Sequence, residues 1–128
     1  MAHRGASKVE VENTTVAFTR ALEMGADAVE LDVRRCGSGE LVVHHDPKLS
    51  DGRAIISVNK KDLPGYIPTL TEALDACGSM WVNIEIKNEP KEPDFDPRMQ
   101  RRMTLTRHFF GDRLKFGVVK SHHQPRCL

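Results

Sequence analysis

Two segments of the chain alternate hydrophobic and polar side chains with the period of two that is typical of a β-strand. They are residues 28–33 and 81–87. A third strand is predicted at residues 41–45, where a hydrophobic run is followed by two histidines. Residues 114–119 are the fourth predicted strand. The pattern therefore predicts a β-sheet whose strands are far apart in the sequence.

Helical periodicity separates these strands. Residues 14–24 place four hydrophobic side chains on one stripe, and Gly25 follows at a position where helices commonly end. Thr69 and Glu72 have the spacing of a capping box, in which each side chain satisfies a backbone N–H group of the other residue. The helix that they begin is expected to end at Gly78.

A third helix is predicted from Asp96 to Phe110, because Asp-Pro suits the cap and first turn of a helix and Gly111 follows. Strands that alternate with helices indicate an α/β fold with a parallel sheet and right-handed crossovers. In such folds the functional side chains lie at the carboxyl ends of the strands.

Composition narrows the class of protein. The chain has 128 residues, is 39% hydrophobic and 29% charged, and has a formal net charge of +1, which suits one domain. No apolar run approaches the roughly 20 residues of a membrane-spanning helix, and we recognise no signal peptide. The cysteines, Cys36, Cys77 and Cys127, are odd in number and widely spaced, unlike those of a disulfide scaffold. We therefore expect a cytoplasmic protein.

Charge is distributed unevenly along the chain. Residues 1–97 contain 11 Lys and Arg against 17 Asp and Glu, whereas residues 98–128 contain 8 basic residues and a single acidic one. One interpretation is an anionic partner for the basic end. The favoured interpretation is a solvated helix face followed by an unstructured end. Aromatic residues make up only 5% of the chain, which argues against stacking on nucleic-acid bases.

Three carboxylates are the strongest candidates for chemistry. Glu30 and Asp32 are two residues apart in a predicted strand, so their side chains share one face, and Glu85 repeats the pattern in the next long strand. Neighbouring carboxylates repel each other unless a cation or a proton neutralises them. Each pair alone is typical of the solvent face of an antiparallel sheet. All three together, in a β/α pattern, favour an oxygen site for Mg²⁺ or Ca²⁺.

Histidines lie next to predicted strand ends. His3 precedes Arg4 and Gly5, and His45 follows a predicted strand. Two histidines beside a metal can act as general acid and base, because histidine titrates near neutral pH. Arg4 can donate to a phosphate oxygen, and Gly5 lets the backbone turn or approach a ligand. The other histidines are expected to be structural or exposed: His44, His108, His122 and His123.

Six short motifs in this order resemble the glycerophosphodiester phosphodiesterase family. They fall within residues 2–90: His3-Arg4-Gly5, Glu12-Asn13-Thr14, Glu30-Leu31-Asp32-Val33, Val42 to Pro47, Ile67-Pro68-Thr69-Leu70 and Asn83-Ile84-Glu85-Ile86-Lys87. The resemblance implies a TIM barrel of the phospholipase-C-like phosphodiesterase type. It also implies a hydrolase of glycerophospholipid metabolism that needs a divalent metal ion, Mg²⁺ or Ca²⁺. Its products would be glycerol 3-phosphate and an alcohol.

The resemblance implies a role for each matching residue. The metal ligands would be Glu30, Asp32 and Glu85. The catalytic pair would be His3 and His45. The residues beside the substrate phosphate would be Arg4 and Lys87. The supporting loop beside the metal would contribute Glu12 and Asn13.

The chain also departs from the family. A TIM barrel has eight strands and about 250 residues, and this chain offers about half of them. We expect a partial barrel domain at residues 1–110 and an unrecognised basic tail at 111–128, for which disorder is left open. The alternative function is an inactive truncated fragment, or a non-catalytic metal-binding or interaction module. A related phosphodiesterase of the same superfamily is the nearest rival enzyme. Open strand edges would permit self-association. We expect a small-molecule substrate and no nucleic-acid partner.

Overall fold

A computed structural model of the chain describes residues 1–98 in full and residues 104–110 and 113–119 by their backbone. The strands are β1 (Ala2–His3), β2 (Ala28–Arg35), β3 (Leu41–Val43), β4 (Trp81–Ile86), β5 (Thr104–Phe110) and β6 (Arg113–Val119). The helices are α1 (Thr15–Glu23) and α2 (Leu70–Cys77), with short 3-10 turns at Ile55–Ser57 and Lys60–Asp62. Within the described residues, no helix is both long enough and apolar enough to cross a membrane.

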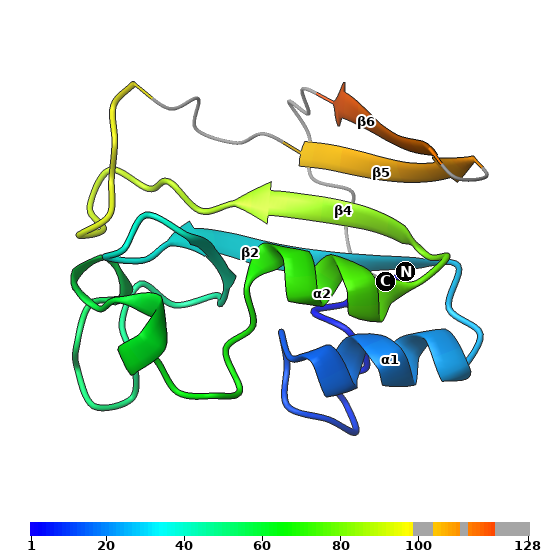
Figure 1. Ribbon diagram of the computed structural model, residues 1–128, viewed down its shortest axis with the longest axis horizontal. Helices are drawn as coiled ribbons and strands as arrows, with labels where there is room; N and C mark the ends of the chain where they lie inside the picture. The colour runs from blue at the N-terminus through cyan, green and yellow to red at the C-terminus, as the bar shows by residue number, and fades with distance from the viewer. Residues whose placement is uncertain (99–103, 111–112, 120–128) are drawn as a thin grey trace.

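The strands form one mixed sheet in the order β1-β2-β4-β5-β6, and β3 pairs with β2 alongside this path (Figure 1). β1, β2 and β4 are parallel to one another, whereas β3, β5 and β6 pair antiparallel with their neighbours. The register places Asp32 beside Glu85, and Glu30 lies between His3 and Asn83. The predicted parallel arrangement therefore holds for the three strands that carry most of the candidate site residues.

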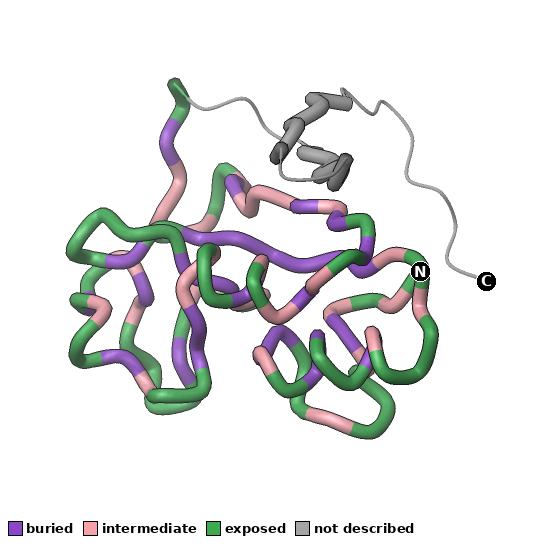
Figure 2. The backbone as a smooth tube through the Cα atoms, turned by 45° about the vertical axis from the view of Figure 1, so that its right-hand side comes forward, coloured by how far each residue is buried: buried purple, intermediate pink, exposed green. Residues whose placement is uncertain are grey.

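α1 and α2 lie side by side on one face of the sheet (Figure 1). The core between the helices and the sheet is built from fully buried side chains, among them Phe18, Val29, Leu31, Val82 and Ile84. Figure 2 shows the buried backbone running along the central strands. Because alternate residues of a strand face opposite sides, this packing turns the polar residues of β2 and β4 to the face away from the helices.

Local capping begins both helices where the sequence predicts it. The Thr14 side chain accepts a hydrogen bond from the Ala17 N–H at the start of α1. At the start of α2, the Thr69 N–H donates to Glu72 Oε2 at 2.8 Å, and the Glu72 N–H donates to Thr69 Oγ1 at 3.1 Å. The predicted capping box is confirmed, and Gly78 caps the end of α2.

The helix predicted from Asp96 to Phe110 is wrong. Asp96 accepts a hydrogen bond from the Arg98 N–H, which is the contact expected of a cap, but residues 104–110 form strand β5 instead of a helix. β5 pairs with the edge of β4 and with β6, and its sequence contains two threonines and two phenylalanines, which suit a strand. Long-range pairing has overridden the local helix signal. The antiparallel pairing of β3, β5 and β6 makes the sheet mixed rather than parallel.

Strand β6 agrees with the strand predicted at residues 114–119. Residues 99–103, 111–112 and 120–128 lie outside the described part of the chain, as does every side chain beyond residue 98. The expectations for Cys127 and for the other histidines beyond Arg98 fall there. The domain boundary predicted at residue 110 and the basic tail at 111–128 stay predictions.

Candidate functional site

Three carboxylates from two neighbouring strands meet on the sheet face away from the helices. Glu30 and Asp32 come from β2, and Glu85 comes from β4 opposite Asp32. One oxygen of each carboxylate lies within 4.8 Å of the others. Glu30 and Asp32 are buried, with exposed fractions of 5% and 1%, and Glu85 is partly buried. The structure thus brings together the three residues that the sequence suggested as metal ligands.

The electrostatics of this cluster fit a bound cation. Burial, together with the negative charges of Asp32 and Glu85, raises the pKa of Glu30 to about 7. Glu30 Oε1 is buried and has no hydrogen-bond partner among the described residues. A buried carboxylate oxygen without a donor is costly, and oxygen-rich clusters of this kind suit hard divalent cations.

Two basic side chains lie against the same carboxylates. Lys87 Nζ is 3.2 Å from Asp32 Oδ1 and 3.0 Å from Glu85 Oε1. Arg4 Nε is 3.1 Å from Asp32 Oδ2, and Arg4 Nη1 donates to Glu12 Oε2 at 3.0 Å. Burial works against the charge of Lys87, but Asp32 and Glu85 outweigh it and raise the pKa of Lys87 above its ordinary value. The side chains of Arg4 and Lys87 are therefore both positively charged at neutral pH.

The loop between β1 and α1 holds Asp32 from the other side. Asn13 Nδ2 donates to Asp32 Oδ2 at 2.9 Å, and the Asp32 N–H donates to Asn13 Oδ1 at 3.3 Å. The Asn13 N–H donates to the Arg4 carbonyl at 3.0 Å. Arg4 and Asn13 have φ angles of 56° and 58°, in the left-handed region that non-glycine residues rarely adopt. Such backbone strain is typical of functional sites.

Gly5 is required where this loop passes over α1. Its φ is 81°, and a Cβ atom at this position would lie 2.7 Å from the Cβ atom of Ala17. Only glycine allows this conformation and this close approach. The loop therefore brings Arg4 and Asn13 to the carboxylates because Gly5 lets it pack tightly on the first helix.

Of the two candidate catalytic histidines, His3 contacts the carboxylate cluster and His45 lies in the loop that follows β3. His3 Nε2 is 3.6 Å from Glu30 Oε2, and about half of the His3 side chain is exposed. His45 follows β3, which runs back along β2 so that the His44 N–H donates to the Asp32 carbonyl at 3.0 Å. His45 Nδ1 is 2.7 Å from Asp46 Oδ1, and this hydrogen bond lowers the pKa of Asp46. The contact fixes the His45 ring and leaves Nε2 for other partners.

A cavity of about 220 Å³ lies between the loop that connects β1 to α1 and the residues that follow β3. Its lining includes Glu12, Asn13, His44 and His45. His44, which the sequence suggested is structural or exposed, hydrogen-bonds through Nδ1 to the Asp46 carbonyl at 2.8 Å.

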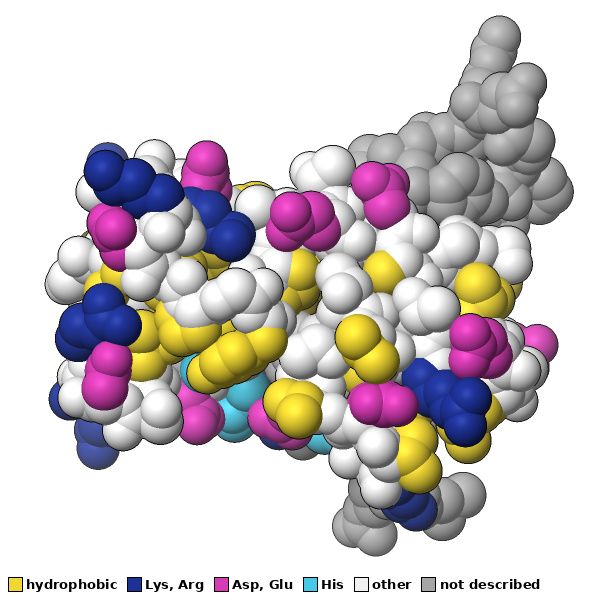
Figure 3. All heavy atoms as spheres, turned by 60° about the horizontal axis from the view of Figure 1, so that its bottom comes forward, with side chains coloured by type: hydrophobic (Ala, Val, Ile, Leu, Met, Phe, Trp, Pro, Cys, Tyr) yellow, Lys and Arg dark blue, Asp and Glu magenta, His cyan; other side chains and the backbone are white. Residues whose placement is uncertain are grey.

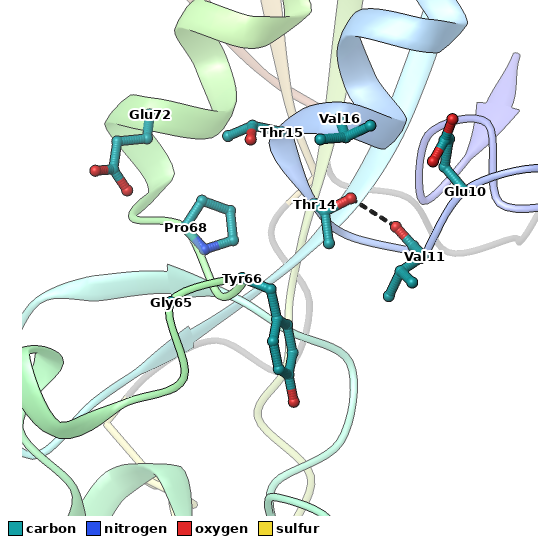
Figure 4. A pocket seen from close by; sticks show the side chains of 9 residues that line it. All are labelled: Glu10, Val11, Thr14, Thr15, Val16, Gly65, Tyr66, Pro68 and Glu72. Atoms are coloured by element: carbon teal, nitrogen blue, oxygen red, sulfur yellow. Dashed lines mark hydrogen bonds between the residues drawn. The ribbon is translucent and has the colours of Figure 1, made fainter.

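A larger groove of about 580 Å³ adjoins this cavity, since Val11 and Tyr66 line both (Figure 4). The groove lies between the beginnings of α1 and α2, where Thr14 Oγ1 donates to the Val11 carbonyl at 2.7 Å. Figure 3 shows hydrophobic side chains beside histidines on this face. Glu10 and Glu72 also line it. The site therefore continues from polar groups into a partly apolar groove.

The sequence did not single out two further polar side chains on the same sheet face. Asn83 Oδ1, beside Glu30 in the register, is buried and has no hydrogen-bond partner within the described segments. Arg34 is buried and donates to the His45 carbonyl at 2.8 and 2.6 Å. Both positions could be found from the alternation along the strands. Arg34 is two residues after Asp32 on β2, and Asn83 is two residues before Glu85 on β4.

Fold and site together define a partial β/α barrel protein whose acidic centre lies on the parallel strands β2 and β4. The chain matches the model of the glycerophosphoryl diester phosphodiesterase family over residues 3–124. It belongs to this family, and the resemblance carried by the sequence motifs is confirmed.

Curated relatives match only part of their length. A glycerophosphodiester phosphodiesterase of Caldanaerobacter subterraneus is 39% identical over an alignment covering 69% of this chain and 44% of the relative. One from Bacillus subtilis is 32% identical over 93% of this chain and 50% of the relative. The chain thus spans about half the length of the curated relatives it matches.

Solved structures give the same picture. A glycerophosphodiester phosphodiesterase from Thermotoga maritima has a TM-score of 0.66 at 33% identity, covering 74% of this chain and 50% of that one. An Oleispira antarctica phosphodiesterase, solved with its product sn-glycerol-3-phosphate, has a TM-score of 0.65 at 33% identity. The match covers 67% of this chain and 43% of that one. The expected partial barrel is confirmed.

Proposed function

We propose that this chain is a metal-dependent phosphodiesterase that cleaves glycerophosphodiesters into glycerol 3-phosphate and an alcohol. The observation that carries the proposal is the cluster of Glu30, Asp32 and Glu85. His3, Arg4 and Lys87 lie against its carboxylates. Family membership supports the reaction type. The chemistry places the activity in glycerophospholipid metabolism, and the predicted cytoplasmic location is kept as part of the proposal.

The three carboxylates would hold the divalent cation. Mg²⁺ and Ca²⁺ both prefer oxygen ligands, and the orphaned Oε1 of Glu30 supports a site for either ion. A bound divalent cation supplies Lewis-acid polarisation of a phosphoryl oxygen. Lys87 and Asn13, which contact Asp32 from opposite sides, fix the ligand carboxylate in place.

Arg4 and Lys87 would bind the substrate phosphate. Both side chains are held near the carboxylates, so their remaining N–H groups can donate to phosphate oxygens. Charge that develops on these oxygens in the transition state is stabilised by donors that are already oriented. Glu12 orients the Arg4 guanidinium through its hydrogen bond to Nη1.

His3 and His45 would move protons. One histidine takes the proton of the attacking hydroxyl group, and the other donates a proton to the departing alkoxide. His45 is held by Asp46 at Nδ1, so Nε2 is the nitrogen that exchanges the proton. The groove continuous with the His45 cavity would receive the alcohol portion of the substrate.

The experiment measures hydrolysis of glycerophosphocholine by the purified chain. The release of glycerol 3-phosphate is monitored in EDTA, in Mg²⁺ and in Ca²⁺. We expect turnover with metal, and a loss of about a hundredfold or more in Glu30→Gln, which removes the ligand charge. Glu23→Gln is the matched control, since Glu23 is an exposed acid on α1.

The opposite outcome has a defined meaning. A chain that folds and binds the metal ion but releases no glycerol 3-phosphate contradicts the proposal. It would favour the alternative of a non-catalytic metal-binding module, which the coverage of only about half of each relative keeps in view.

A further inference from the structure

We propose that Arg34 is a positioning residue that holds His45 and the acidic loop after β4 in one fixed arrangement. The acidic loop is defined as residues 89–94. The inference rests on the proposed function, in which His45 transfers a proton. It assigns a role to a side chain that touches neither the carboxylate cluster nor the expected substrate.

Arg34 contacts the backbone of His45. Arg34 lies two residues beyond Asp32 on β2, on the sheet face that carries the site. Its Nε and Nη2 atoms donate to the His45 carbonyl at 2.8 and 2.6 Å. Two donors from a planar guanidinium restrain both the position and the orientation of that peptide group.

Arg34 also contacts the acidic loop. Arg34 Nη1 donates to Asp94 Oδ2 at 2.8 Å and to Glu92 Oε2 at 3.0 Å, and Nη2 donates to Glu92 Oε1 at 3.1 Å. The side chain of Arg34 is 1% exposed and that of Asp94 is 4% exposed. Burial opposes the charge of Arg34, but hydrogen bonds to Glu92 and Asp94 outweigh it and keep its pKa raised.

A buried ion cluster of this kind contributes little net stability. Removing charges from water costs about as much as their attraction returns, so apolar side chains often replace such clusters without loss. What the cluster provides is a defined geometry. The contacts of Arg34 therefore point to the arrangement of His45 rather than to the stability of the fold.

The acidic loop is itself closed at its base. Asn88 Nδ2 donates to the Asp96 carbonyl at 3.0 Å, and the Asp96 N–H donates to Asn88 Oδ1 at 2.9 Å. Figure 1 shows this yellow segment returning to the cyan end of β2. Asn88, at the base of the acidic loop, directly follows Lys87. The Arg34 guanidinium therefore links the backbone of His45 to the end of β4, beside the lysine proposed to bind phosphate.

The ring and the backbone of His45 are thus fixed by different residues. Asp46 holds Nδ1 of the ring, and Arg34 holds the carbonyl. A misplacement of about 1 Å in an acid–base group can cost about a hundredfold in rate. Lysine in place of Arg34 keeps the charge but loses the paired donors, so it tests geometry more than charge.

The test compares Arg34→Lys with Arg35→Lys, its exposed neighbour on the same strand. For each variant, kcat and KM are measured on glycerophosphocholine, Mg²⁺ affinity by calorimetry, and the imidazole signals of His45 and His3 by NMR. In Arg34→Lys we expect kcat to fall about tenfold or more while KM and Mg²⁺ affinity change less than about twofold. The His45 signals should shift and those of His3 should not. Arg35→Lys should behave as the unaltered chain.

Three results would overturn the proposal. One is an Arg34→Lys variant with unaltered kcat and unaltered His45 signals. Another is a fall in kcat matched by an equal fall in Mg²⁺ affinity, which is the signature of a general structural role. If Arg34→Lys does not fold, Asp94→Asn replaces it, because this variant removes one anchor of Arg34, and an unaltered kcat there is the third.

Failure of the proposed function gives a different signature. If the unaltered chain hydrolyses nothing, the phosphodiesterase proposal fails, and the histidine signals alone decide the role of Arg34. A shift of the His45 signals in Arg34→Lys without a shift in His3 would still support positioning. An absence of both shifts would still overturn it.

Discussion

Glu30 is the residue whose charge state governs the site. It is one of two buried carboxylates packed against a third, and its pKa of about 7 means that without a cation it is half protonated near neutral pH. A divalent cation favours the charged form and displaces the proton. The cluster is therefore a pH-dependent element of the fold, and under the proposed function it would also be the metal site.

The first prediction concerns stability against pH without metal. Because the folded-state pKa of Glu30 is raised, its contribution to stability is present below the unfolded-state pKa and declines as pH rises through about 7. In EDTA, the free energy of unfolding from urea titrations should fall between pH 5 and pH 8 by about 1 to 3 kcal/mol. Glu30→Gln should flatten this slope. An unaltered slope in that variant would assign the pH dependence to another group.

The second prediction concerns Gly5. Gly5 and Gly25 have nearly equal φ angles, 81° and 79°, but a Cβ atom at Gly5 would meet Ala17 at 2.7 Å, whereas at Gly25 it would meet no described atom within 4 Å. Gly25→Ala should cost about 1 kcal/mol of stability for its backbone conformation. Gly5→Ala should cost about 1 to 3 kcal/mol more for the clash. Equal costs in thermal or chemical melts would show that the loop yields without strain.

Helices and strands show how far local sequence determines this fold. The starts of α1 and α2 were predictable because helix caps and hydrophobic stripes depend only on residues that are close in sequence, as Thr69 and Glu72 show. β2 and β4 were predictable because period-two alternation marks them. β5 was not, because its pairing depends on the edge of β4, which a local reading of Asp96 does not contain.

The candidate site likewise contains residues that the strand pattern predicts and contacts that it does not. Glu30, Asp32 and Glu85 were predicted to converge because parallel strands align their ends, and the register confirms it. The position of Arg34 follows from the alternation along β2, but its partners do not, because the His45 carbonyl and Asp94 lie in loops whose paths no periodicity predicts. Strand residues of a site are therefore easier to predict than the loop contacts that orient them.

A third prediction belongs to α2. Thr69→Ala removes the side-chain oxygen that accepts from the Glu72 N–H and should cost about 1 kcal/mol of stability. Thr71→Ala is the matched control, because Thr71 is exposed on the same helix and alanine is a better helix former. Urea titrations of both variants measure the difference. A loss in Thr71→Ala as large as that in Thr69→Ala would contradict the importance of the capping box.

At the scale of the whole molecule, the question is whether the proposed metal site assembles in a chain that spans about half the length of its relatives. All three carboxylates come from β2 and β4, which pair with each other, and the core on α1 and α2 supports both strands. β5 pairs with the outer edge of β4, so that edge is covered within the described strands. These contacts imply that the cluster needs no further strand to form.

The fourth prediction follows from that assembly. A metal ion that binds only the folded chain adds about 2.7 kcal/mol of stability at a hundredfold excess over its dissociation constant, which corresponds to a rise of about 10 °C in Tm. Circular-dichroism melts in EDTA and in excess Mg²⁺ or Ca²⁺ should show this rise, and Asp32→Asn should abolish it. Asp27→Asn is the control, since Asp27 precedes the same strand outside the cluster. A melt that does not respond to either ion would mean that the carboxylates meet without forming a binding site.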